Sequence, residues 1–139
     1  MAKHSYIQSG SARGHYTYDG KEEEFNTQSA GFFNPKTFTF TFKPDGLSAV
    51  TVFIRWTTDP SSDLPETYLF RSPNDPALGL KAEALVEGGG LPEETESGQI
   101  TFNTFAGGAA PRVNADLEDL KFTFNGKTLS LRDVHIQAP

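Results

Sequence analysis

Alternation of apolar and polar side chains is the strongest signal in this chain, and it is clearest between Thr37 and Trp56. Phenylalanine and threonine alternate up to Phe42, a turn signal (Lys-Pro-Asp-Gly) follows at 43–46, and the alternation then resumes. Because successive side chains of an extended chain point to opposite faces, this stretch predicts two half-buried strands in an antiparallel hairpin. One face of this hairpin forms the predicted nucleus of the core: Phe38, Phe40, Phe42, Val50, Val52, Ile54 and Trp56.

Similar patterns, bounded by turn formers, recur along the rest of the chain. The Asp19-Gly20 and Asn125-Gly126 pairs have the chemistry of two-residue hairpin turns. The run of three glutamates at 22–24 is unfavourable in the middle of a sheet, so it predicts an edge strand. Further strands are predicted at 3–8, 13–18, 21–28, 66–71, 77–87, 99–104, 112–119, 120–124 and 127–136.

Two loops and one ambiguous segment complete this description. Residues 29–36 contain a proline at position 35 and predict a loop. The glycine- and glutamate-rich residues 88–98 predict a mobile surface loop. Residues 77–87 fit both an alternating strand and a helical apolar stripe. We interpret them as a strand because glycines bracket them and the surrounding pattern is β.

The last predicted strand changes the parity of its apolar positions. Leu129 and Leu131 share one parity, whereas Val134 and Ile136 have the other. All four can face the interior only if one extra residue is inserted, so the pattern predicts a β-bulge near Arg132 and Asp133.

About nine or ten short strands without a clear helix predict an all-β fold. We expect one domain over residues 1–139, built as an antiparallel β-sandwich of the Greek-key or jelly-roll type. A small closed β-barrel is the alternative. The sandwich is preferred because short hairpins alternate with longer connections.

Charge and composition restrict the function classes. The net charge of -6 and the absence of a Lys/Arg cluster argue against nucleic-acid binding. Without cysteine the chain has no disulfide, thiolate metal site or cysteine nucleophile. No segment has the length and apolarity of a membrane span or signal peptide, so a soluble chain is predicted, in the cytoplasm or secreted after processing.

Catalytic motifs are not found. His4, His15 and His135 lie far apart without metal-ligand spacing, and no nucleophile elbow, phosphate-binding loop or dinucleotide fingerprint occurs. We therefore expect no catalytic residue, metal or cofactor. An enzyme or small-ligand barrel would need a deep pocket where His15 or His135 meets carboxylates.

Aromatic side chains beside acidic loops suggest ligand binding, because such rings stack on sugars while polar groups bond hydroxyls. The alternatives are a core position for Trp56 and solvated turn formers in the loop after it. The predicted ligand-binding residues are Tyr16, Tyr18, Trp56, Asp59, Asp63, Tyr68 and Arg71.

These observations favour a non-enzymatic binding module that recognises a carbohydrate or a protein partner through loops at one end of the sandwich. The alternative is a structural or accessory protein that forms a homo-oligomer, since aromatic residues also build ordinary interfaces. An enzyme or a small-ligand barrel ranks third.

Overall fold

A computed structural model of the chain describes residues 10–34, 36–56, 67–71, 80–88, 92–106, 112–124 and 126–138. Within these ranges, the backbone alone is described for Trp56, Tyr68, Leu69, Arg71, Leu80, Phe105 and Ala106.

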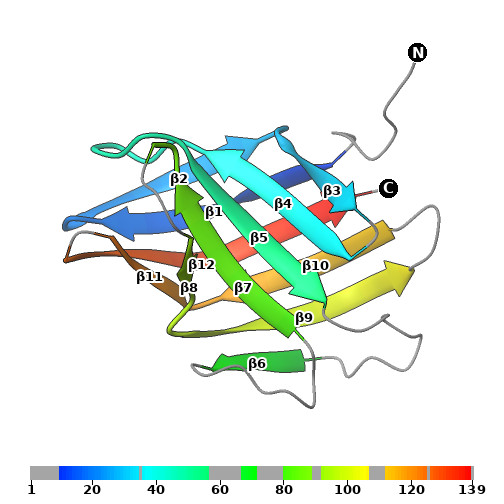
Figure 1. The fold of residues 1–139 in the computed structure, drawn as a ribbon. Coiled ribbons are helices and arrows are strands. Elements are labelled where there is room, and N and C mark those ends of the chain that lie inside the picture. The colour runs from blue at the N-terminus through cyan, green and yellow to red at the C-terminus, as the bar shows by residue number, and fades with distance from the viewer. Residues whose placement is uncertain are drawn as a thin grey trace.

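Two antiparallel sheets pack face to face as a β-sandwich, which confirms the predicted fold class (Figure 1). The seven-stranded sheet has the order β2-β1-β12-β10-β9-β6, with β11 also paired to β12. Its strands are β1 (Ser11–Tyr18), β2 (Lys21–Thr27), β6 (Thr67–Arg71), β9 (Ser97–Ala106), β10 (Arg112–Glu118), β11 (Leu120–Phe124) and β12 (Lys127–Ala138).

The five-stranded sheet has the order β3-β4-β5-β7-β8 and lies in front in Figure 1. Its strands are β3 (Ala30–Asn34), β4 (Thr37–Phe42), β5 (Val50–Trp56), β7 (Leu80–Val86) and β8 (Glu93–Glu94). In the part of the chain that the structure describes, no helix is long and apolar enough to cross a membrane.

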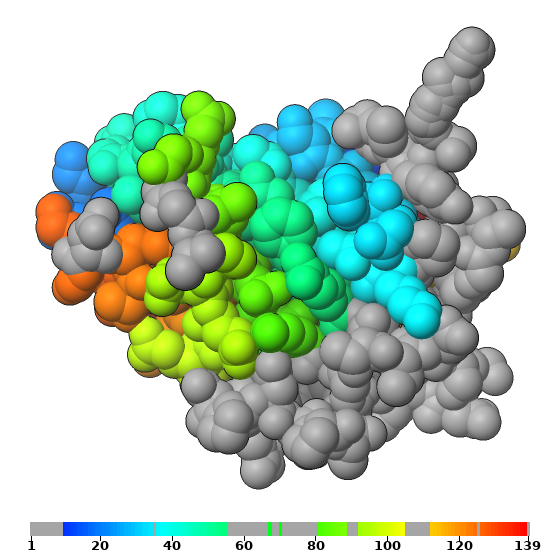
Figure 2. Space-filling model, viewed as in Figure 1, coloured from blue at the N-terminus to red at the C-terminus, as the bar shows by residue number. Residues whose placement is uncertain are grey.

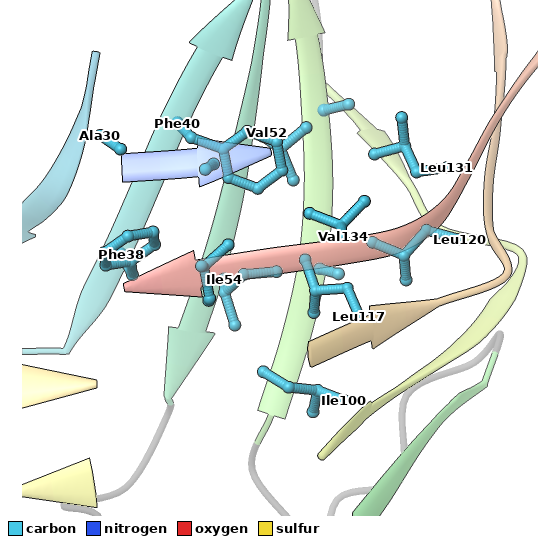
Figure 3. Packing of buried hydrophobic residues seen from close by; sticks show 14 of the residues in the cluster. Ala30, Phe38, Phe40, Val52, Ile54, Ile100, Leu117, Leu120, Leu131 and Val134 are labelled. Carbon is cyan, nitrogen blue, oxygen red and sulfur yellow. The ribbon is translucent and has the colours of Figure 1, made fainter. Parts of the chain in front are cut away.

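The hairpin of β4 and β5 forms as its alternation predicts. Phe38 lies opposite Ile54, and Phe40 lies opposite Val52. All four side chains are fully buried. Figure 3 shows them facing Leu117, Leu120, Leu131 and Val134 of the seven-stranded sheet, so the core is the space between the sheets.

The predicted bulge in β12 is present. The register of β1 with β12 changes between Arg13 and His15, and Asp133 has a φ of 51°. The extra residue restores the parity, because Leu129, Leu131, Val134 and Ile136 are all fully buried. Gly14 lies beside the bulge, where it leaves room for the backbone of Val134.

The hairpin turns and the edge strand also agree with the sequence. Asp19 and Gly20 both have positive φ, as a primed two-residue turn requires. The strand with the glutamate run, β2, lies at a sheet edge. Residues 80–86 form a strand, so the strand interpretation of 77–87 is confirmed over the described part.

Two predicted loops are wrong in part. Residues 30–34 form the edge strand β3, because Phe32 pairs with Phe38 and packs edge-on against its ring at 5.4 Å. In the segment 88–98, residues 93–94 form β8, and β9 starts at Ser97. Thr95 is buried between them and bonds Lys121 of β11, so this corner is anchored. The predicted strand at 3–8 lies outside the described residues.

Candidate functional site

Tyr16 and Tyr18 were predicted to bind ligand, but their side chains lie on the inner face of β1. Their exposed fractions are 3% and 6%. The Tyr16 hydroxyl donates to Glu23 Oε2 at 2.8 Å and accepts from the Asp45 amide at 2.9 Å. Neither ring is open for stacking on a ligand, because the parity of β1 directs both toward Phe42 and the core.

The other predicted ligand-binding residues are not brought together by the described part of the structure. Trp56 ends β5 in the five-stranded sheet, whereas Tyr68 and Arg71 belong to β6 in the seven-stranded sheet. Their side chains are not described, and Asp59 and Asp63 lie outside the described residues. Ligand binding by these five residues stays a prediction.

An open cleft of about 370 Å³ lies instead on β1, β2 and the bulge of β12. Arg13 pairs in register with Asn26, and His15 pairs with Glu24, across the hairpin. Gly14 lies between them and opposite Phe25. The lining residues are Arg13, Gly14, His15, Glu24, Phe25, Asn26 and Asp133.

Polar groups in this cleft keep hydrogen-bonding capacity. His15 Nε2 lies 3.4 Å from Glu24 Oε1, and His15 Nδ1 is buried without a hydrogen-bond partner among the described residues. The side chains of Arg13 and Asn26 make no hydrogen bond or ion pair within the part of the chain that the structure describes. Arg13 and Asn26 can therefore bond an incoming ligand without breaking a contact among the described residues, whereas His15 Nδ1 is buried and His15 Nε2 lies beside Glu24.

Beside the cleft, the outer face of the seven-stranded sheet carries a network of satisfied polar groups. Arg132 Nε donates to Glu22 Oε2 at 2.8 Å, and Arg132 Nη1 lies 2.9 Å from Asp133 Oδ2. Glu118 Oε1 accepts the Asp133 amide at 3.1 Å. These contacts hold the bulge in place, because they engage both its backbone and its carboxylate.

Two carboxyl groups of the seven-stranded sheet, those of Asp116 and Glu118, have shifted pKa values. Burial acts to raise the pKa of Asp116, but hydrogen bonds with His135 and Asn103 and the positive charges of His135 and Arg13 lower it overall. For Glu118, burial raises the pKa, the Asp133 amide lowers it, and the Asp133 and Asp119 carboxylates raise it again. The net result is a lowered pKa for Asp116 and a raised one for Glu118.

Asp116→Asn is expected to remove a stabilising contribution that is present above the usual carboxyl pKa of 3.8. Because the folded-state pKa lies below 3.8, this contribution declines as the pH falls below 3.8 and is lost as the pH falls through the lowered folded-state pKa. The effect should stay below about 1 kcal/mol because the carboxylate is partly exposed. Urea unfolding of both proteins from pH 3 to pH 7 measures it: the two stabilities should converge at low pH, and a constant gap would contradict the prediction.

The opposite face of the molecule offers less for a ligand. Figure 2 views this face, where β4, β5 and β7 cross the centre. Three of its charged side chains form ion pairs, since Glu83 contacts Arg55 at 3.5 Å and Lys81 at 3.7 Å. Glu83 Oε1 is nevertheless buried without a hydrogen-bond partner among the described residues. Among the described residues, Phe33 is the one large hydrophobic side chain that is exposed, at 70%.

Sequence reasoning missed most of this site, although part of the signal was present. A two-residue turn at Asp19-Gly20 sets the register, so Arg13 opposite Asn26 and His15 opposite Glu24 follow from it. The outward parity of Arg13 and His15 did not follow from the sequence, because Tyr16 and Tyr18 were assigned to ligand binding, whereas the structure buries both. Asp133 joins the cleft through long-range pairing of β1 with β12, which no local pattern reveals.

Metal-binding geometry is not seen within the described ranges, where no group of three or more His, Asp or Glu side chains could hold an ion. Comparisons of the chain with protein-family models, curated proteins and solved structures found no match. The cleft and its side chains are therefore the basis for assigning a function.

Proposed function

We propose that this chain is a non-enzymatic binding module that holds a carbohydrate unit in the cleft on β1, β2 and the β12 bulge. The observation that carries the proposal is a pair of polar side chains, Arg13 and Asn26, that have no hydrogen-bond partner among the described residues and line an open cleft of about 370 Å³. This volume is at the small end of ligand sites, which span roughly 300 to 1,000 Å³.

A sugar suits these groups because each hydroxyl can both donate and accept a hydrogen bond. Arg13 donates, Glu24 and Asp133 accept, and the Asn26 carboxamide does both. The supporting strands are paired on both sides of β1, with β2 and β12 as neighbours. Binding groups on such paired strands are held in place before the ligand arrives, which reduces the entropy lost on binding.

Recognition of a protein partner, or assembly of copies, ranks second. The specific feature in its favour is the exposed Phe33 on β3. A single exposed apolar residue is normal on a protein surface and does not by itself indicate an interface. The cleft groups several polar side chains in one place, so carbohydrate binding has the better support.

A glycan array tests this proposal. Asn26→Ala should weaken binding of the recognised glycan at least about tenfold, because a hydrogen bond to the ligand is lost. Phe33→Ala is the control on the other sheet and should leave binding unchanged. Thermal unfolding should show both variants to be as stable as the parent, since both side chains are exposed.

The outcomes separate the two candidate surfaces. If no glycan binds the parent protein, carbohydrate recognition is overturned. If binding survives Asn26→Ala and is lost with Phe33→Ala, the ligand surface lies on β3 and not in the cleft.

A further inference from the structure

Resting on that proposed function, we infer that the ligand is an acidic saccharide whose carboxylate binds Arg13. The charged side chains around the cleft differ in their partners, and these differences favour a hexuronic acid residue with its carboxylate at Arg13.

Arg13 differs from the cations beside it on the outer face of the seven-stranded sheet. Arg132 is bound by Glu22 and Asp133, and His135 Nδ1 lies 2.8 Å from Asp116 Oδ1. Arg13 lines the cleft and makes no hydrogen bond or ion pair with the residues that the structure describes, although its charge contributes to the lowered pKa of Asp116. Its guanidinium offers a planar set of donors that matches a carboxylate in a bidentate pair.

Asn26 strengthens this end of the cleft. It lies directly opposite Arg13 across the β1–β2 pair, and its carboxamide is equally unengaged among the described residues. Its amide group can donate to the second oxygen of a carboxylate or to the ring oxygen of a sugar. Two neighbouring donors without a hydrogen-bond acceptor among the described residues favour an acceptor group on the ligand.

The other end of the cleft has the opposite character. His15 and Glu24 already form a pair at 3.4 Å, and Asp133 is held by Arg132. The carboxylates of Glu24 and Asp133 favour hydroxyl donors and disfavour a second anion there. Arg13 and His15 are two residues apart on one strand, roughly 7 Å, which suits groups on opposite sides of one sugar ring.

Charge further limits the ligand to a short one. The chain carries a net charge of -6, and Glu22 and Glu24 share the outer face of β2 with Asn26. A long polyanion would meet these carboxylates along its length and be repelled. One uronic acid residue, or the acidic end of a mixed oligosaccharide, places a single carboxylate at Arg13.

The test compares sugars that differ in one group, the carboxylate at C6. Methyl glucuronide and methyl galacturonide are titrated beside methyl glucoside and methyl galactoside at pH 7 and low salt, with NMR shifts of the backbone amides as the readout. The parent protein should bind at least one uronide tenfold more tightly than its neutral counterpart. The largest shifts should lie at Arg13, His15 and Asn26.

Arg13→Gln should reduce the preference for the uronide to within twofold. Arg112→Gln is the matched control: Arg112 is exposed on β10 of the same sheet, but outside the cleft. It should keep the full preference, which excludes a general effect of net charge. Arg13→Lys should keep part of the preference, because the charge remains while the bidentate geometry is lost.

Failure of this inference can be distinguished from failure of the proposed function. Equal binding of neutral and acidic sugars, with both weakened by Asn26→Ala, would overturn the carboxylate assignment and leave the cleft as a sugar site. A preference that survives Arg13→Gln would also overturn the assignment. If neither the parent's array nor the titrations show sugar binding, both proposals are wrong.

Discussion

Phe40→Ala is expected to lower the free energy of unfolding by about 3–5 kcal/mol. Phe40 is fully buried at the centre of the β4–β5 hairpin, opposite Val52. Its ring lies 6.0 Å from that of Phe25 and 6.2 Å from that of Phe42. Alanine loses the burial of the ring and leaves a cavity between two sheets that cannot close over it. Urea unfolding followed by far-UV circular dichroism measures the change.

Phe33→Ala is the matched control, because it makes the same substitution on the same sheet. The Phe33 side chain is 70% exposed, so its removal should change stability by less than about 0.5 kcal/mol. Similar losses for the two variants would contradict the placement of the core between the sheets.

Gly14→Ala is expected to destabilise the protein by up to about 3 kcal/mol, through overpacking. A Cβ atom at Gly14 would lie 2.8 Å from Val134 Cα and 3.1 Å from the Asp133 carbonyl oxygen. Backbone atoms must therefore move, and they belong to the bulge that keeps Val134 and Ile136 inside. Urea unfolding gives the stability, and the amide NMR signals of residues 132–135 should report the displaced bulge.

Two further variants identify the cause. Thr17→Ala on the same strand should cost less than about 1 kcal/mol, because its half-buried side chain points outward. Val134→Ala removes the side-chain atom that is 2.8 Å from the added Cβ but leaves the backbone contacts. In that background Gly14→Ala should still destabilise. A full rescue would show that the clash with the Val134 side chain, and not with the bulge backbone, causes the loss of stability.

Elements made by local pairing were predictable from the chain. The β4–β5 hairpin and the β1–β2 turn each join neighbours in sequence, so period-two burial and turn chemistry act together. The bulge at Asp133 was predictable for a related reason: four buried residues of mixed parity cannot face one core without an inserted residue.

The two wrongly predicted loops show where local signals mislead. Gly31 and the proline after Asn34 are typical of a loop, yet β3 forms because Phe32 and Ala30 find partners on β4 and face the core. In the acidic segment before β9, Thr95 bonds Lys121 and thereby joins β8 to the other sheet. Both segments are ordered by contacts with another strand. The local secondary-structure propensity of their residues does not reveal those contacts.

By itself, the sequence determined the fold class, the main hairpins and the inward faces of β4, β5 and β12, because these depend on side-chain parity and short turns; the inward face of β1 became clear only from the burial of Tyr16 and Tyr18. Only the tertiary structure decided which outward-facing side chains of different strands lie side by side. Pairing of β1 with β12 joins residues more than one hundred positions apart and brings Asp133 beside Arg13 and His15. Such pairing depends on the complete sandwich, since closing so long a loop is compensated only by burial of the whole core.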